Sequence, residues 1–134
     1  MRRYLLDTNA VGDFLNRRYN FPQRVQKERG NGVVIGTCEP VVAELFFGVE
    51  NSSSRAENLV RLQRGLRRLK CWPLTRAASA KFGELAAELR RAGRPIGQID
   101  ILVAAIAMTL GNCTVVSIDT DMGAIPGLSV EDWR

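Results

Sequence analysis

Two periodicities alternate along this chain of 134 residues: short apolar runs, and longer segments whose apolar residues recur at helical spacing. The short runs predict strands over residues 3–6, 33–35, 70–74, 114–118 and 128–130. The longer segments predict helices over residues 8–17, 22–29, 40–49, 55–69, 76–91 and 98–110. Strands that alternate with helices favour an α/β fold in which helices cover a mostly parallel sheet.

Two aspartates directly follow predicted strands. Asp7 comes after the strand at 3–6, and Asp119 comes after the strand at 114–118. Both are therefore expected at the carboxyl ends of parallel strands, which is where sheets of this kind bind ligands. The alternative for each aspartate is a purely structural role as the N-cap of the next helix.

Two further carboxylates lie on apolar helical segments. Asp100 falls in the first turn of the segment 98–110, which is apolar on all sides and is expected at the centre of the protein. Glu44 is the only polar residue in the middle of its helix, and Gly48 leaves space beside it. A charge on a mostly buried helix is unfavourable unless it is paired or bound to a metal. The alternatives are a salt bridge to an arginine for Glu44 and a favourable helix-dipole position for Asp100.

We expect these four carboxylates to surround one point. Clustered carboxylates repel one another unless a cation neutralises them, and a ligand set made only of oxygens suits Mg²⁺ or Mn²⁺. Such an ion can activate a water molecule and stabilise the charge that develops on a phosphodiester during in-line attack. The candidate catalytic residues are therefore Asp7, Glu44, Asp100 and Asp119.

The complete absence of histidine narrows the chemistry further. It excludes the Ser-His-Asp triad, the Cys-His dyad and every metal site built on imidazole. The three cysteines Cys38, Cys71 and Cys113 lie far apart, so neither a disulfide framework nor a zinc cage is expected. Free cysteines are typical of a reducing compartment, and we expect a cytoplasmic protein.

The overall composition is ordinary for a globular protein, with 46% hydrophobic and 25% charged residues. The length predicts a single domain over residues 1–134. No apolar run approaches the roughly 18 residues of a membrane span, and the N-terminal apolar stretch is shorter than that of a secretion signal. Neither a membrane association nor a leader peptide is therefore expected.

Positive charge is concentrated in the middle of the chain, which carries a net charge of +5 overall. Residues 55–94 contain eleven Lys and Arg residues against three Glu, whereas the segment after Arg94 is acidic. A basic flank beside an acidic cluster suggests that a polyanion is held near a cation site, with a solvated helix face as the alternative. The predicted helix at 55–69, with Ser54 as its cap, presents the basic residues Arg61, Arg64, Arg67 and Arg68.

Several short motifs occur in a characteristic order and spacing over nearly the whole chain. They are Leu5-Leu6-Asp7-Thr8-Asn9, Val42-Ala43-Glu44-Leu45 with Gly48, Ile96-Gly97-Gln98-Ile99-Asp100, Ser117-Ile118-Asp119-Thr120-Asp121, and Ile125-Pro126-Gly127-Leu128 followed by Glu131-Asp132-Trp133. Each motif is weak alone, but as a set they resemble the PIN-domain ribonucleases. Within that family the chain is similar to the VapC-type toxins of toxin–antitoxin pairs.

The resemblance implies a three-layer α/β/α sandwich and a metal-dependent endoribonuclease. It implies a Mg²⁺ or Mn²⁺ ion at Asp7 and Asp100, which Asp119 joins directly or through water, while Glu44 shapes the site or activates water. Around them the family pattern places the polar positions matching Asn9 and Ser117, with Asp121 as a weaker candidate. The arginines at 61, 64, 67 and 68 become candidates for binding RNA.

The resemblance also implies partners. The family acts on structured RNA, often transfer RNA, with ribosomal RNA as another possible target. Its toxins commonly form homodimers and are silenced by a VapB-type antitoxin.

Two other function classes remain open at this stage. A phosphoryl-accepting module also places aspartates at strand ends, but it needs a lysine at the end of a later strand, and Lys70 begins a predicted strand instead. A non-catalytic relative that binds RNA or protein is the second alternative. The presence of all four acids argues against it.

Overall fold

The computed structural model describes the whole chain, residues 1–134, and has a five-stranded sheet at its centre. All neighbouring strands are parallel, and the order across the sheet is β3-β2-β1-β4-β5. The strands are β1 (Arg3–Leu6), β2 (Val34–Cys38), β3 (Lys70–Trp72), β4 (Cys113–Val116) and β5 (Ser129–Glu131). The first strand of the chain is thus the central strand of the sheet.

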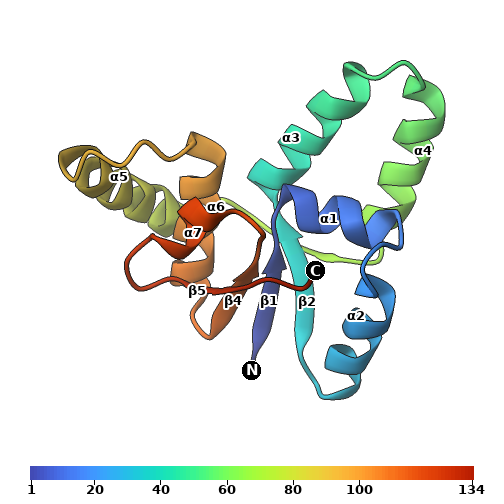
Figure 1. The fold of residues 1–134 in the computed structure, drawn as a ribbon, viewed down its shortest axis with the longest axis horizontal. Coiled ribbons are helices and arrows are strands. Elements are labelled where there is room, and N and C mark those ends of the chain that lie inside the picture. The colour runs from blue at the N-terminus through green and yellow to red at the C-terminus, as the bar shows by residue number, and fades with distance from the viewer.

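Seven helices flank this sheet in two groups, which Figure 1 shows on opposite sides of the strands. They are α1 (Thr8–Leu15), α2 (Phe21–Gly30), α3 (Glu39–Glu50), α4 (Arg55–Leu66), α5 (Arg76–Arg91), α6 (Gln98–Leu110) and α7 (Thr120–Gly123). Helices α1 to α3 contact β1 and β2, whereas α6 contacts β4 and carries α5 on its other side. This arrangement confirms the predicted α/β sandwich and its parallel sheet.

Most predicted elements are present, and the differences lie at their ends. Helix α1 ends at Leu15, since Asn16 takes the C-cap position and Arg17 adopts a positive φ of 56°. Strand β4 ends at Val116, because only the Ser117 amide still bonds to β5 and Ile118 turns towards solvent. Helix α7 is too short to carry a periodic pattern, and the sequence analysis missed it.

The apolar core lies on both faces of the sheet. Helix α6 contributes its whole central segment, because Val103 and Ala104 to Ala107 are all buried. This confirms that an all-apolar helix lies centrally in the protein. Helices α1 and α4 approach each other closely at Gly65. A Cβ atom at this position of α4 would lie 1.7 Å from the Leu15 side chain of α1. Glycine at this position allows α4 to pack tightly against α1.

Residues 131–134 connect the sheet to α1 and α2 through packing and hydrogen bonds. We call Glu131 to Arg134 the C-terminal clamp. Trp133 is buried between Tyr4 and Phe21, with ring centroids 4.9 and 5.5 Å away. Arg134 pairs with the buried Asp13, its Nε donating to Oδ2 at 2.9 Å and its Nη2 to Oδ1 at 3.2 Å.

No helix combines the length and hydropathy that a bilayer span would require.

Candidate functional site

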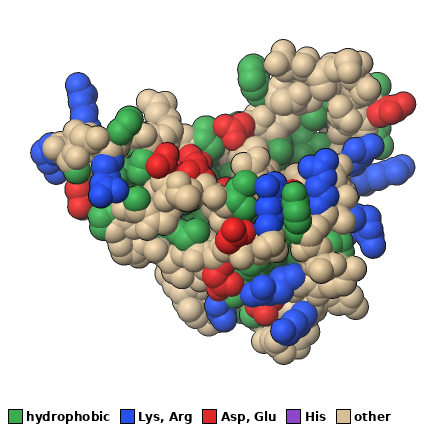
Figure 2. Space-filling view, in the orientation of Figure 1, with side chains coloured by type: hydrophobic (Ala, Val, Ile, Leu, Met, Phe, Trp, Pro, Cys, Tyr) green, Lys and Arg blue, Asp and Glu red, His purple; other side chains and the backbone are tan.

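All four predicted catalytic carboxylates line one pocket, which we call the carboxylate pocket. Its volume is about 510 Å³, and it lies beyond the carboxyl ends of β1 and β4. Figure 2 shows acidic side chains gathered near the middle of one face, between the two groups of helices. The lining residues are Asp7, Thr8, Asn9, Glu44, Gly97, Gln98, Ile99, Asp100, Leu102 and Asp119.

Asp7 is placed by the end of β1 and the start of α1. Its carboxylate caps α1 by accepting a hydrogen bond from the Ala10 amide at 2.9 Å, and the residue is buried. Burial raises the pKa of Asp7, an effect that hydrogen bonds from Ser117 and Ala10 oppose and the negative charge of Asp119 reinforces. Capping and a position in the pocket are therefore compatible rather than alternative roles.

Asp100 lies in the first turn of α6 and is half-buried. Burial raises its pKa to about 6, and Asp119 contributes through charge repulsion and a hydrogen bond. The charges of Asp7 and Glu44 act in the same direction. Three other carboxylates thus act on Asp100, which is the electrostatic signature of a shared anionic site.

Asp119 and Asp7 are connected through Ser117. The Asp119 amide donates to the Ser117 hydroxyl oxygen at 3.0 Å, and the Ser117 side chain also lowers the pKa of Asp7. Asp119 also caps the short helix α7 by accepting from the Asp121 amide at 2.9 Å. Asp121 itself is exposed and lies outside the pocket lining, whereas Asn9 is part of that lining.

Glu44 is in the pocket, but its setting differs from the prediction of a mostly buried helix. Only Pro40, Val41 and Val49 of α3 are buried, and Glu44 is exposed. The sequence suggested burial because the helix is nearly all apolar, yet α3 covers the sheet with one side only. Glu44 forms no salt bridge, and instead its Oε1 accepts a 2.5 Å hydrogen bond from the Thr8 hydroxyl.

Thr8 was not singled out from the sequence, although it directly follows Asp7. It lines the pocket and holds Glu44 through its hydroxyl. Asp13 was also missed, because its partner Arg134 is 121 positions away in the chain and no local pattern connects them.

The chemistry of the pocket fits a hard divalent cation. Four carboxylates line it together with Thr8, Asn9 and Gln98, and no Lys or Arg is among the lining residues. The side chains do not form a ready-made ligand cluster, since no three acidic or cysteine side chains stand in metal-binding arrangement. Burial, reinforced by repulsion from neighbouring carboxylates, raises the pKa of Asp7 and of Asp100, and a bound cation would compensate this negative charge.

The basic residues of segment 55–94 do not form one surface in the structure. Residues 55–94 include both α4 and α5, which lie on opposite sides of the molecule (Figure 1). On α4, a cavity of about 340 Å³ is lined by Arg61, Arg64 and Arg68, whereas the exposed Arg67 is outside its lining. Ser54 occupies the N-cap position of α4 but forms no side-chain capping bond.

Comparison with known proteins agrees with this geometry. The model of the PIN domain family matches residues 4–128. The chain is 28% identical to the tRNA(fMet)-specific endonuclease VapC of Shigella flexneri and 31% identical to ribonuclease VapC2 of Haemophilus influenzae, each over 99% of both chains.

A solved structure is also very similar. The VapBC2 structure from Rickettsia felis, bound to a DNA fragment from the promoter, contains a chain that superposes with a TM-score of 0.91. The two chains are 29% identical, and the match covers 98% of this chain and 99% of the other. The family match, the relatives and the carboxylate pocket lead to one conclusion: this chain belongs to the PIN-domain family, within its VapC ribonuclease group.

Proposed function

We propose that the protein is a divalent-metal-dependent endoribonuclease, the toxin of a toxin–antitoxin pair. The observation that carries the proposal is the carboxylate pocket, in which Asp7, Glu44, Asp100 and Asp119 come together without a basic residue. Asp7, Asp100 and Asp119 would hold Mg²⁺ or Mn²⁺ through their carboxylate oxygens. When bound, such an ion activates water and neutralises charge on the phosphate that is attacked.

The protein's own groups would divide the remaining work. Glu44 is exposed at the pocket, and the Thr8 hydroxyl fixes one of its oxygens, so the other oxygen is free to accept a proton from the attacking water. Ser117 lowers the pKa of Asp7 against the effect of burial, and its hydroxyl oxygen accepts from the Asp119 amide. Asn9 offers an amide beside them at the pocket wall.

The proposed substrate is a structured RNA, and transfer RNA is the first to test. The name of the Shigella relative specifies tRNA(fMet), which makes this RNA the natural starting point, with ribosomal RNA as the second. The proposed partner is a VapB-type antitoxin, because the Rickettsia relative was solved as a VapBC assembly on promoter DNA.

The decisive experiment is cleavage of tRNA(fMet) by the purified protein after removal of metal with EDTA, followed by addition of Mg²⁺ or Mn²⁺. We expect cleavage to vanish with EDTA, to return with either ion, and to be absent from Asp100→Asn at every ion concentration. Glu84→Gln is a suitable control, since Glu84 is exposed on α5 away from the pocket. Cleavage that survives both EDTA and Asp100→Asn would exclude the proposed mechanism. RNA binding without any cleavage would favour a non-catalytic RNA-binding module.

A further inference from the structure

Three neighbouring cavities form a continuous path over the surface. A groove of about 500 Å³ between α1, α3 and α4 shares Thr8 and Glu44 with the carboxylate pocket. The same groove shares Leu15 and Arg61 with the smaller cavity on α4. The path therefore leads from the acids of the carboxylate pocket to the arginines of α4, and we call its middle section the α1–α4 groove.

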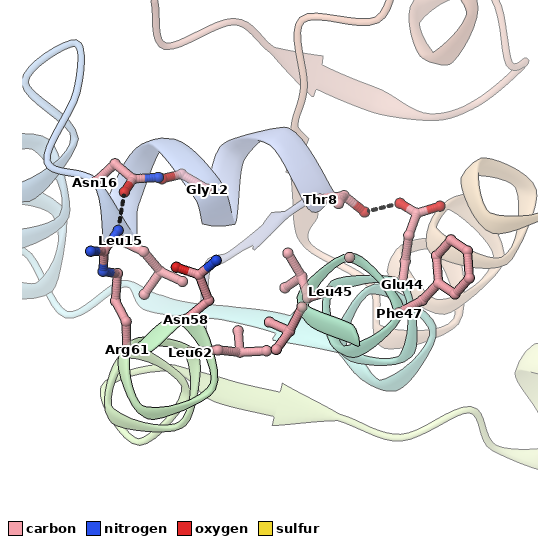
Figure 3. A pocket seen from close by; sticks show the side chains of 12 residues that line it. Thr8, Gly12, Leu15, Asn16, Glu44, Leu45, Phe47, Asn58, Arg61 and Leu62 are labelled. Atoms are coloured by element: carbon pink, nitrogen blue, oxygen red, sulfur yellow. Dashed lines mark hydrogen bonds between the residues drawn. The ribbon is translucent and has the colours of Figure 1, made fainter. Parts of the chain in front are cut away.

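The chemistry of the α1–α4 groove changes along its length. Figure 3 shows Glu44 held by Thr8 at one end and Arg61 at the other, where Arg61 donates to the Asn16 side chain at 3.3 Å. Leu45 and Leu62 lie between these ends (Figure 3). Next to Glu44 is Phe47, a residue that is 69% exposed even though it is one of the large apolar residues of the protein.

The arginines beyond the groove have no acidic partners. Arg61 and Arg64 lie one turn apart on α4, Arg68 follows two residues after α4 ends, and all three line the same cavity. None of the three forms a salt bridge, and Glu57 is the only acid in the lining of their cavity. A row of cations without acidic partners, at and just beyond the end of α4, matches the phosphates of a polyanion.

We propose that the α1–α4 groove is a track for a single-stranded segment of the RNA substrate. The scissile phosphate lies at the carboxylate pocket, an unpaired base stacks on Phe47 and the leucines, and flanking phosphates bind Arg61, Arg64 and Arg68. Unpaired bases stack on aromatic rings, whereas the bases of a duplex are already stacked and hidden from such a groove. The placement of the scissile phosphate depends on the nuclease function proposed above, but the binding of RNA along the groove can be tested separately.

The test measures RNA binding in the full-length Asp7→Asn variant, so that no cleavage interferes. A single-stranded RNA of about 12 nucleotides is titrated at several KCl concentrations, with and without reversal of Arg61, Arg64 and Arg68 to Glu. Each phosphate contact on a single strand contributes about 0.7 to the slope of log K against log salt, so the reversal should make the slope shallower by about 2. We expect affinity at low salt to fall by at least tenfold.

A matched control separates the track from overall charge. Arg90, Arg91 and Arg94 are exposed, form no salt bridges and lie at or just beyond the carboxyl end of α5. Their reversal to Glu changes the net charge equally, yet it should leave the salt slope unchanged. Equal effects of the two triple variants would overturn the proposal. It would also be overturned if the α4 reversal abolished binding of an acidic peptide while RNA binding stayed intact, or if a duplex of the same sequence bound as tightly.

The apolar part of the track has its own test. Phe47→Ala should weaken binding of the single strand roughly tenfold, the effect typical of losing one stacked base, and Phe47→Trp should restore it. The Trp variant should also show fluorescence quenching when RNA binds. Unchanged affinity in Phe47→Ala would show that the Phe47 ring does not bind RNA. Because both tests read binding in an inactive variant, loss of the track is distinguishable from failure of the nuclease proposal, which is read from cleavage by the unaltered protein.

Discussion

Helix α1 connects two acidic regions that differ in how their charge is compensated. At its start, Asp7 faces Asp100 and Asp119 in a pocket whose lining contains no Lys or Arg. Further along, the buried Asp13 is bound through both oxygens by Arg134, and Glu131 nearby accepts from Arg2, Arg24, Tyr4 and Trp133. The two regions contain the same kind of acidic side chain, but the surroundings of those side chains differ.

The difference indicates which acids hold the fold together and which are available to a ligand. A buried carboxylate whose oxygens are paired with guanidinium groups has its charge satisfied within the protein. A carboxylate whose neighbours are other carboxylates has a raised pKa and leaves charge for an external cation. The C-terminal clamp is therefore a structural element, and the carboxylate pocket is the site that we propose for the reaction.

The sharpest comparison is the same substitution at both ends of α1. Asp7→Asn should reduce RNA cleavage by roughly 1000-fold or more, because it removes a proposed metal ligand, and this corresponds to about 4 kcal/mol of barrier. Asp13→Asn should lower thermal stability but leave the cleavage rate of the folded protein within a few fold. Rates are measured at saturating Mg²⁺ well below both melting temperatures. Similar rate losses in the two variants would contradict the distinction between a reactive Asp7 and a structural Asp13.

The clamp itself is tested by removing its aromatic anchor. Trp133→Ala deletes a buried ring that packs on Tyr4 and Phe21, and it should cost about 3–5 kcal/mol in the free energy of unfolding. The measurement is urea denaturation followed by circular dichroism. Trp72, which is buried at the opposite edge of the sheet, offers Trp72→Ala as a control for general loss of core volume. A loss below 1 kcal/mol for Trp133→Ala would mean that the clamp contributes little to the fold.

A smaller effect is expected at Thr8, which acts on the pocket through Glu44. Thr8→Val keeps the shape of the side chain but removes the hydroxyl that positions the Glu44 carboxylate. Cleavage should slow about tenfold, the lower end of the range for residues that orient a metal-site group. Thr8→Ser should retain near-normal activity, because serine keeps the hydroxyl that donates to Glu44. Equal activity of the Thr8→Val and Thr8→Ser variants would contradict the proposed role of Thr8 in positioning Glu44.

The smallest expected effect is a pH dependence of stability in metal-free protein. The pKa of Asp100 is raised from 3.8 to about 6, so between about pH 4 and 6 the folded chain holds a proton that the unfolded chain has lost. The contribution of Asp100 to stability is therefore greatest at low pH and is lost as the pH rises through 6. In EDTA, Asp100→Asn should stabilise the protein more at pH 7.5 than at pH 4.5, as measured by urea midpoints. Saturating Mg²⁺ should reverse this advantage at pH 7.5, whereas an equal effect of Asp100→Asn at both pH values would contradict the raised pKa.

The sequence predicted the parts of the site that depend on local pattern. Asp7 and Asp119 follow short apolar strands, and parallel strands bring their carboxyl ends to one edge of the sheet. Exposure of Glu44 could not be predicted, because it depends on how much of α3 the sheet covers. The separation of the basic residues of segment 55–94 into two groups could not be predicted either. It arises because α4 and α5 pack on different sides of the molecule, which no local pattern indicates.

The central position of β1 has a consequence for how the protein is made. Asp7 is synthesised first, yet β1 gains its neighbour β4 only after residues 113–116 exist, and Asp119 follows still later. Contacts between distant parts of a chain form after both parts are available, so the nuclease pocket cannot assemble on an unfinished chain. Strand order alone thus delays assembly of the carboxylate pocket until residues 113–119 have been made.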